Sequence, residues 1–210
     1  MARTVRIKAG EDSVTGKVEG VGEVGILLAH GAGTNQDHPV LVATRSALAQ
    51  GGVQVMTFNY PYSEAGRSGP DSAERLLTCH RAALAKLAEK CPAGTFLAGR
   101  SMGGRMGTYL AAEGADVLGV ICYGYPLHPP GKPDRLRIDH LGSIKVPMLF
   151  FQGDRDALSR SDLFDRHIRS LAQAKVLDLK ADHSLGGLKS VDLLACETLS
   201  FVDKVAKQVL

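Results

Sequence analysis

The sequence lacks long apolar runs and any strong excess of charge of one sign. The longest apolar runs, such as 26–29 and 148–151, are far too short to cross a bilayer, so no membrane partner is expected. Residues 1–12 contain no apolar segment typical of a secretion signal, and a cytoplasmic location is therefore expected. The net charge is only +3 with acidic and basic residues interspersed, which argues against a nucleic-acid partner.

A cysteine framework is also missing. The four cysteines are scattered, and none forms a C-x-x-C pair or stands at zinc-finger spacing from a histidine. Free thiols, no metal and no cofactor are therefore expected. What the chain does have is 210 residues, of which 44% are hydrophobic, enough for a single domain over 1–210. This composition is compatible with either a monomer or a homodimer.

Strand and helix patterns alternate along the chain. Two short strands are predicted at 5–8 and 13–19, followed by buried strands at 24–29, 53–59, 94–99, 117–123, 146–151 and 174–179. Helices are predicted at 39–50, 72–89 (capped by Asp71), 102–113, 161–171 and 188–209, with a short one near 135–141. The alternation predicts an α/β fold, a mostly parallel sheet with helices on both faces and ligands at the carboxyl ends of its strands.

One short motif carries chemistry. Gly99-Arg100-Ser101-Met102-Gly103 follows a predicted strand and opens a predicted helix, the context of a G-x-S-x-G nucleophile elbow. The pentapeptide alone is equally compatible with a plain strand-to-helix turn. The loop His30-Gly31-Ala32-Gly33 also ends a strand, so the backbone amides of Ala32 and Met102 are candidates for an oxyanion hole. His30 itself is expected to be structural.

An acid and a histidine follow later in the chain. Asp156 completes a G-x-x-D pattern after a buried strand and is preferred as the acid over Asp154, which could instead brace the turn. His183 lies on the loop after the last predicted strand, where the alternative is a plain surface histidine. The order Ser101, Asp156, His183 matches a catalytic triad in which the acid orients the histidine and the histidine takes the serine proton.

Several loops could form the wall of a substrate pocket. Tyr123, Tyr125 and His128 follow a strand whose end faces the same sheet edge as the serine, although a purely structural loop is an equal alternative. Segments 34–38 and 60–67 are further candidates. The loop between this strand and the next is too short for a helical lid, so an open site for small or flexible substrates is expected.

The elbow, the H-G-A-G loop, the late acid and histidine, and the segment Y-G-Y-P-L-H-P-P-G at 123–131 together resemble the α/β-hydrolase superfamily. More closely, they resemble its small, lid-less members related to dienelactone hydrolases, over about 24–209. The resemblance implies a three-layer α/β-hydrolase fold without a large lid. Many dienelactone hydrolases use a cysteine nucleophile, whereas this elbow carries Ser101, so the dienelactone substrate is not carried over.

The resemblance implies a carboxylesterase-like serine hydrolase that cleaves a small-molecule carboxylic ester or thioester through an acyl-enzyme, without cofactor or metal. An acyltransferase or peptidase with the same triad is the alternative among enzymes. A non-catalytic binding module with this fold is the alternative outside them. Arg100 and Arg105 flank the serine, and either could attract an anionic substrate or form a surface ion pair.

Overall fold

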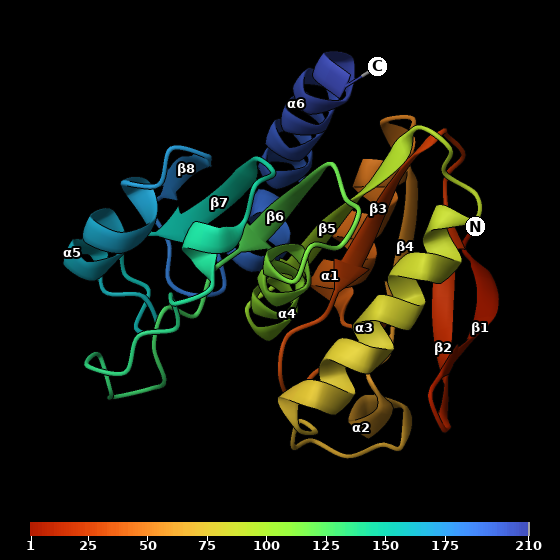
Figure 1. Cartoon of the computed structure of the whole chain (residues 1–210), viewed down its shortest axis with the longest axis horizontal. Coiled ribbons are helices and arrows are strands. Elements are labelled where there is room, and N and C mark those ends of the chain that lie inside the picture. The colour runs from red at the N-terminus through yellow and green to blue at the C-terminus, as the bar shows by residue number, and fades with distance from the viewer. Residues whose placement is uncertain (210) are drawn as a thin grey trace.

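A computed structural model describes residues 1–209 and shows an eight-stranded sheet between two layers of helices (Figure 1). The strands lie in the order β1-β2-β4-β3-β5-β6-β7-β8, in which β1 and β2 are antiparallel, β2 is antiparallel to β4, and the remaining neighbours are parallel. The strand bounds are β1 Arg3–Ala9, β2 Asp12–Glu19, β3 Val24–Ala29, β4 Gln54–Phe58, β5 Gly94–Arg100, β6 Gly119–Tyr123, β7 Met148–Gly153 and β8 Ala174–Leu179. This arrangement confirms the predicted fold class.

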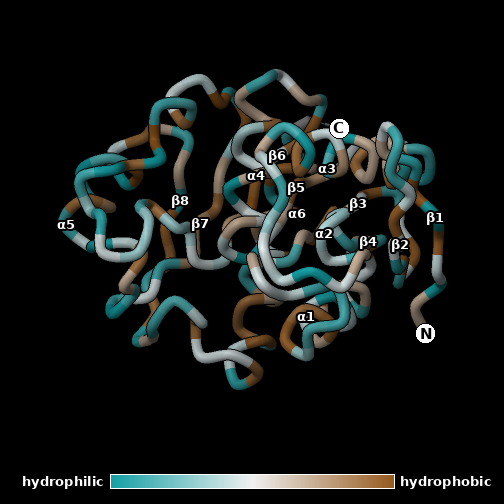
Figure 2. Tube along the Cα trace, turned by 90° about the horizontal axis from the view of Figure 1, so that it is seen from below, coloured by the Kyte–Doolittle hydropathy of each residue, from teal (hydrophilic) through white to brown (hydrophobic). Residues whose placement is uncertain are grey.

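The central strands are apolar throughout because helices cover both of their faces. In β3, Ile26 and Leu28 point into one core, whereas Leu27 and Ala29 point into the other. This alternation follows from the two-residue repeat of a strand. Helices α3 (Ala73–Ala88), α4 (Met102–Ala112) and α5 (Ser161–Phe164) cover the first face, and α1 (Pro39–Gln50) and α6 (Val191–Val209) cover the other (Figure 1). Figure 2 shows hydrophilic and hydrophobic residues next to one another around α5, whose Ser161 is exposed and whose Phe164 is buried.

The ends of α1 agree with the predictions, whereas the residue that caps α3 does not. Helix α1 has the predicted bounds, with Pro39 in its first turn. The predicted cap of α3 is wrong: Ser72 is the N-cap and accepts a hydrogen bond from the Arg75 amide at 3.4 Å. Asp71 instead accepts one from the Tyr62 amide at 2.7 Å, because helix α2 (Pro61–Glu64), which was not predicted, lies beside it.

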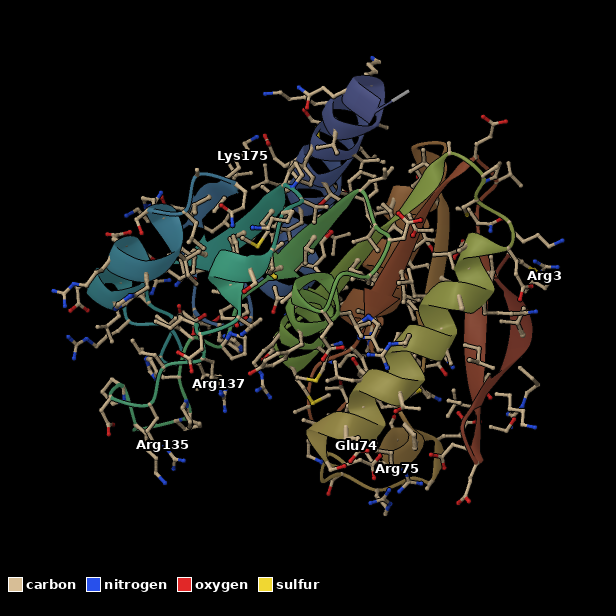
Figure 3. All side chains as sticks on the ribbon, viewed as in Figure 1. Arg3, Glu74, Arg75, Arg135, Arg137 and Lys175 are labelled. Carbon is tan, nitrogen blue, oxygen red and sulfur yellow. The ribbon has the colours of Figure 1, made fainter. Side chains whose placement is uncertain are left out.

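Two further elements differ from the predictions. The helix predicted at 161–171 is the short α5 followed by a π-helical stretch at Asp165–Arg169. The helix predicted near 135–141 is a single 3₁₀ turn at Leu141–Ser143. Within residues 1–209 no helix is both long and apolar enough to span a membrane. Charged side chains such as Arg3, Arg75 and Lys175 project outward from the rim (Figure 3).

Candidate active site

Ser101 occupies a tight turn between β5 and α4. Its backbone φ of 48° and ψ of −115° are unfavourable for a residue with a side chain, and the Ser101 amide is held by the Tyr123 carbonyl at 3.1 Å. A Cβ on Gly99 would lie 2.4 Å from the backbone of Gly103, and one on Gly103 would lie 2.6 Å from the Ala29 carbonyl oxygen. Only glycine therefore allows this close approach, which places the serine at the carboxyl end of the sheet.

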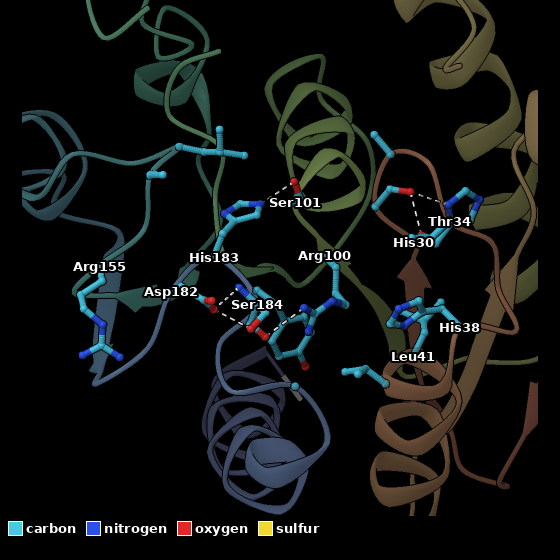
Figure 4. A pocket seen from close by; sticks show the side chains of 17 residues that line it. His30, Thr34, His38, Leu41, Arg100, Ser101, Arg155, Asp182, His183 and Ser184 are labelled. Atoms are coloured by element: carbon cyan, nitrogen blue, oxygen red, sulfur yellow. Dashed lines mark hydrogen bonds between the residues drawn. The ribbon is translucent and has the colours of Figure 1, made fainter. Parts of the chain in front are cut away.

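Ser101, His183 and Asp156 form one line of hydrogen bonds. His183 Nε2 lies 2.8 Å from Ser101 Oγ (Figure 4), and His183 Nδ1 lies 2.8 Å from Asp156 Oδ2. The Asp156 side chain is fully buried, and its other oxygen accepts the Leu158 amide at 2.8 Å. A carboxylate accepting from Nδ1–H leaves Nε2 with its lone pair toward the serine hydroxyl.

The structure brings Asp156, and not Asp154, to the histidine. Asp154 is partly exposed and pairs with Lys180, whose ammonium lies 3.1 Å away and lowers the pKa of the Asp154 carboxyl. Asp154 therefore stabilises the turn between β7 and the histidine loop, which is the alternative role that the sequence left open.

Glycines at neighbouring strand ends let the histidine loop approach. A Cβ on Gly153 would lie 2.5 Å from the Asp182 carbonyl oxygen, and one on Gly124 would lie 3.0 Å from the His183 carbonyl oxygen. Gly124 also has a φ of +70°, which disfavours other residues. Sequence reasoning missed this role of Gly124, although its place directly after a buried strand was a usable signal.

The H-G-A-G loop is held by a network centred on the Gly31 carbonyl. That oxygen accepts hydrogen bonds from His30 Nδ1 at 2.8 Å, Thr34 Oγ1 at 2.9 Å and Tyr62 Oη at 3.3 Å. His30 Nε2 accepts the Tyr60 amide at 3.2 Å, so the ring acts as a neutral bridge. Burial lowers the pKa of His30 to about 4, which keeps it neutral at ordinary pH.

This network orients the Ala32 amide. In a trans peptide the carbonyl of one residue and the N–H of the next point in opposite directions, so three donors on the Gly31 oxygen turn the Ala32 N–H away from them. Ala32 lines the pocket, and a Cβ on Gly31 would lie 3.7 Å from the Ser101 Cβ. Within residues 1–209, neither the Ala32 nor the Met102 amide donates a hydrogen bond, so both remain available to a ligand.

A pocket of about 670 Å³ opens over Ser101 and His183. Tyr123 lines it, with its hydroxyl 2.8 Å from Thr198 Oγ1 and its ring stacked on Phe151. From the segment 34–38, Thr34 and His38 also line it, and helix α1 adds Val40 and Leu41 (Figure 4).

Tyr125 and His128, which were expected in the pocket wall, lie elsewhere. Tyr125 is buried, and its hydroxyl donates to the Arg137 carbonyl at 2.7 Å. His128 is buried too, and its Nε2 accepts the Arg160 amide at 3.3 Å. Both therefore stabilise the loop after β6, and the sequence-based expectation is corrected. Their side chains turn away because the chain bends at Gly124 immediately after the strand.

The two arginines beside the serine have different surroundings. Arg100 lines the pocket, whereas Arg105 does not and its guanidinium lies 5.8 Å from the centre of the Tyr109 ring. Among residues 1–209, no group of three or more His, Cys, Asp or Glu side chains is placed to hold a metal.

The fold and the elbow together define an α/β protein with a serine at the carboxyl edge of a mostly parallel sheet. Residues 22–209 match the family described as alpha/beta hydrolase domain, and the chain belongs to that family.

Solved structures share this fold at low sequence identity. An alpha-beta serine hydrolase homologue from Coxiella burnetii is 18% identical with a TM-score of 0.74, covering 93% of this chain and 96% of the other. A thioesterase domain from the curacin biosynthetic pathway is 16% identical with a TM-score of 0.77, covering 95% and 99%. A lid-less a/b serine hydrolase from Xanthomonas campestris is 17% identical with a TM-score of 0.71, covering 100% and 95%.

Proposed function

We propose that this protein is a serine hydrolase that cleaves a small carboxylic ester or thioester through an acyl-enzyme. The observation that carries the proposal is the line of two 2.8 Å hydrogen bonds from Ser101 through His183 to the buried Asp156. Membership of the alpha/beta hydrolase family supports hydrolase activity in general.

In the first half of the reaction, His183 Nε2 takes the proton of Ser101 as Oγ attacks the substrate carbonyl carbon. The amides of Ala32 and Met102 stabilise the negative oxygen of the tetrahedral intermediate. The carbonyl re-forms, the bond to the leaving group breaks, and His183 gives the proton to the departing oxygen or sulfur. The products are the acyl-enzyme and a free alcohol or thiol.

In the second half, His183 takes a proton from water, and the hydroxide attacks the acyl carbon. The intermediate collapses to a carboxylic acid, and Ser101 regains its proton from His183. The His183 side chain is 27% exposed and lines the pocket, so water can enter the site. This access favours hydrolysis over acyl transfer, which needs water to be excluded. The open pocket and the apolar Val40 and Leu41 support a small acyl group.

Labelling with a fluorophosphonate probe tests this proposal. The native protein is expected to gain one phosphonyl group, located on Ser101 by peptide mass spectrometry, because only an activated serine reacts at a useful rate. Ser101→Ala should not be labelled, whereas Ser170→Ala, which removes an exposed serine distant from the pocket, should be labelled like the native protein. A native protein that is folded by circular dichroism yet unlabelled would refute the triad mechanism.

A further inference from the structure

Arg100 is the last residue of β5 and the immediate neighbour of the nucleophile. It pairs in register with Tyr123, and its side chain lines the pocket between the histidine loop and α1 (Figure 4). One guanidinium nitrogen, Nη2, donates a hydrogen bond to the Ser184 carbonyl at 3.0 Å. An arginine has five N–H donors, so most of its hydrogen-bonding capacity remains available.

This guanidinium has no acidic partner. Within residues 1–209, no carboxylate lies within ion-pair distance of Arg100, although the side chain is half-buried. By contrast, the buried Arg45 is paired with Glu19 at 2.9 Å. Burial lowers the pKa of Arg100, because removal from water disfavours the charged guanidinium. Removing a cation from water without a counter-ion is costly, and a bound anion would recover part of that cost.

The other charged groups of the pocket are already engaged or solvated. Both the amide and the hydroxyl of Ser184 donate to the Asp182 carboxylate, at 2.9 Å and 2.5 Å. The Arg155 side chain is 67% exposed and lies 3.8 Å from Asp154. Asp156 is hidden behind His183. Arg100 is therefore the pocket cation best placed to receive a charged ligand group.

We propose that the substrate of this pocket carries a carboxylate a few bonds from the scissile carbonyl, and that the Arg100 guanidinium binds it. This inference rests on the proposed hydrolase function and adds the substrate class to it. A guanidinium matches a carboxylate with two parallel hydrogen bonds, which orients as well as attracts the ligand. The carboxylate takes no part in bond breaking, so its effect falls mainly on KM.

A pair of esters that differ only in charge tests the proposal. In 4-nitrophenyl hexanoate the acyl chain ends in a methyl group, and in mono-4-nitrophenyl adipate a carboxylate replaces that methyl. The readout is the ratio of kcat/KM for the adipate to that for the hexanoate. We expect Arg100→Gln, which keeps an N–H donor for the Ser184 carbonyl, to lower this ratio at least about tenfold, chiefly through KM. Arg100→Lys should retain an intermediate ratio.

A second pair places the carboxylate on the other side of the scissile bond, with 4-nitrophenyl acetate and 3-carboxy-4-nitrophenyl acetate. Dependence of the ratio on Arg100 in either pair supports the proposal and shows on which side the anion lies. Arg81→Gln, which removes an exposed positive charge on α3, is the matched control and should leave both ratios unchanged.

The proposal is overturned if Arg100→Gln leaves the ratio unchanged in both pairs, because the guanidinium then does not recognise the anion. If kcat/KM falls equally on the charged and neutral esters in that case, Arg100 only holds the histidine loop through Ser184. Failure of the proposed function itself looks different, because the native protein would then neither react with the fluorophosphonate nor hydrolyse any of the esters.

Discussion

Two buried histidines behind the oxyanion loop predict how stability depends on pH. His80, on α3, is fully buried, with Nδ1 3.0 Å from the Tyr60 hydroxyl and Nε2 without a hydrogen-bond partner in the described structure. Burial lowers the pKa of His80 to about 3 and that of His30 to about 4. Both rings are therefore neutral in the folded protein across the ordinary pH range.

The direction of the pH effect on stability follows from which state, folded or unfolded, binds more protons. In the unfolded chain a histidine takes up a proton below about pH 6.5, whereas these two folded histidines do not until pH 3–4. The unfolded state is thus favoured as pH falls below 6.5. Below pH 6.5 each histidine lowers the free energy of unfolding by about 1.4 kcal/mol per pH unit, which amounts to about 2 kcal/mol between pH 7 and pH 5. The pair together should remove about 4 kcal/mol, a large part of a typical domain's 5–15 kcal/mol.

Urea unfolding at pH 7 and pH 5, for the native protein and for His80→Gln, measures this effect. The variant is less stable at pH 7 because it loses the contact with Tyr60, but it should lose about 2 kcal/mol less than the native protein between the two pH values. Other titrating groups are common to both proteins and cancel in this double difference. An identical pH dependence of the two unfolding free energies would refute the reasoning.

Three further changes test the site. Asp156→Asn should lower kcat on a short-chain 4-nitrophenyl ester by about 10⁴, because the triad histidine would adopt the wrong tautomer. Asp154→Asn should change kcat less than about threefold, and equal losses would contradict the assignment of the acid. His30→Ala should lower kcat/KM by about 10² while the circular dichroism spectrum is retained, because it loosens one oxyanion donor; an unchanged rate would show that the loop needs no such support. Gly103→Ala should lower the free energy of unfolding in urea by at least about 2 kcal/mol, because its Cβ would lie 2.6 Å from a carbonyl oxygen. Gly69→Ala, whose Cβ would have no atom within 4 Å, should lower it by less than about 1 kcal/mol.

The local sequence pattern was enough to predict most of the helices and strands. The bounds predicted for the helix at 39–50 and the strand at 174–179 are those of the structure. Continuous apolar runs identify strands covered on both faces, and proline and glycine mark the helix ends, so these signals lie within each segment itself. The elbow was visible because its G-x-S-x-G pattern is contiguous in the sequence, although the glycine at 103 is required by contact with the Ala29 carbonyl of β3.

Caps and pocket walls depended on neighbours that are remote in sequence. Asp71 is a good capping residue by type, yet it accepts the Tyr62 amide because α2 packs against the start of α3. Tyr125 and His128 follow the right strand, but the bend at Gly124 turns them into the loop core. In each case a tertiary hydrogen bond decided between two roles that the local sequence allowed.

The sequence by itself determined the order of elements, the elbow and the set of candidate residues. Only the tertiary structure decided that Asp156 rather than Asp154 lies against His183, and that Arg100 rather than Arg105 enters the pocket. The physical reason is direction. Asp154 and Asp156 both lie in the segment directly after β7, where the local sequence does not fix which carboxylate faces His183, and His183 itself comes from a loop 82 residues beyond Ser101. Arg100 ends β5 whereas Arg105 lies in the first turn of α4, so their side chains leave the backbone in different directions.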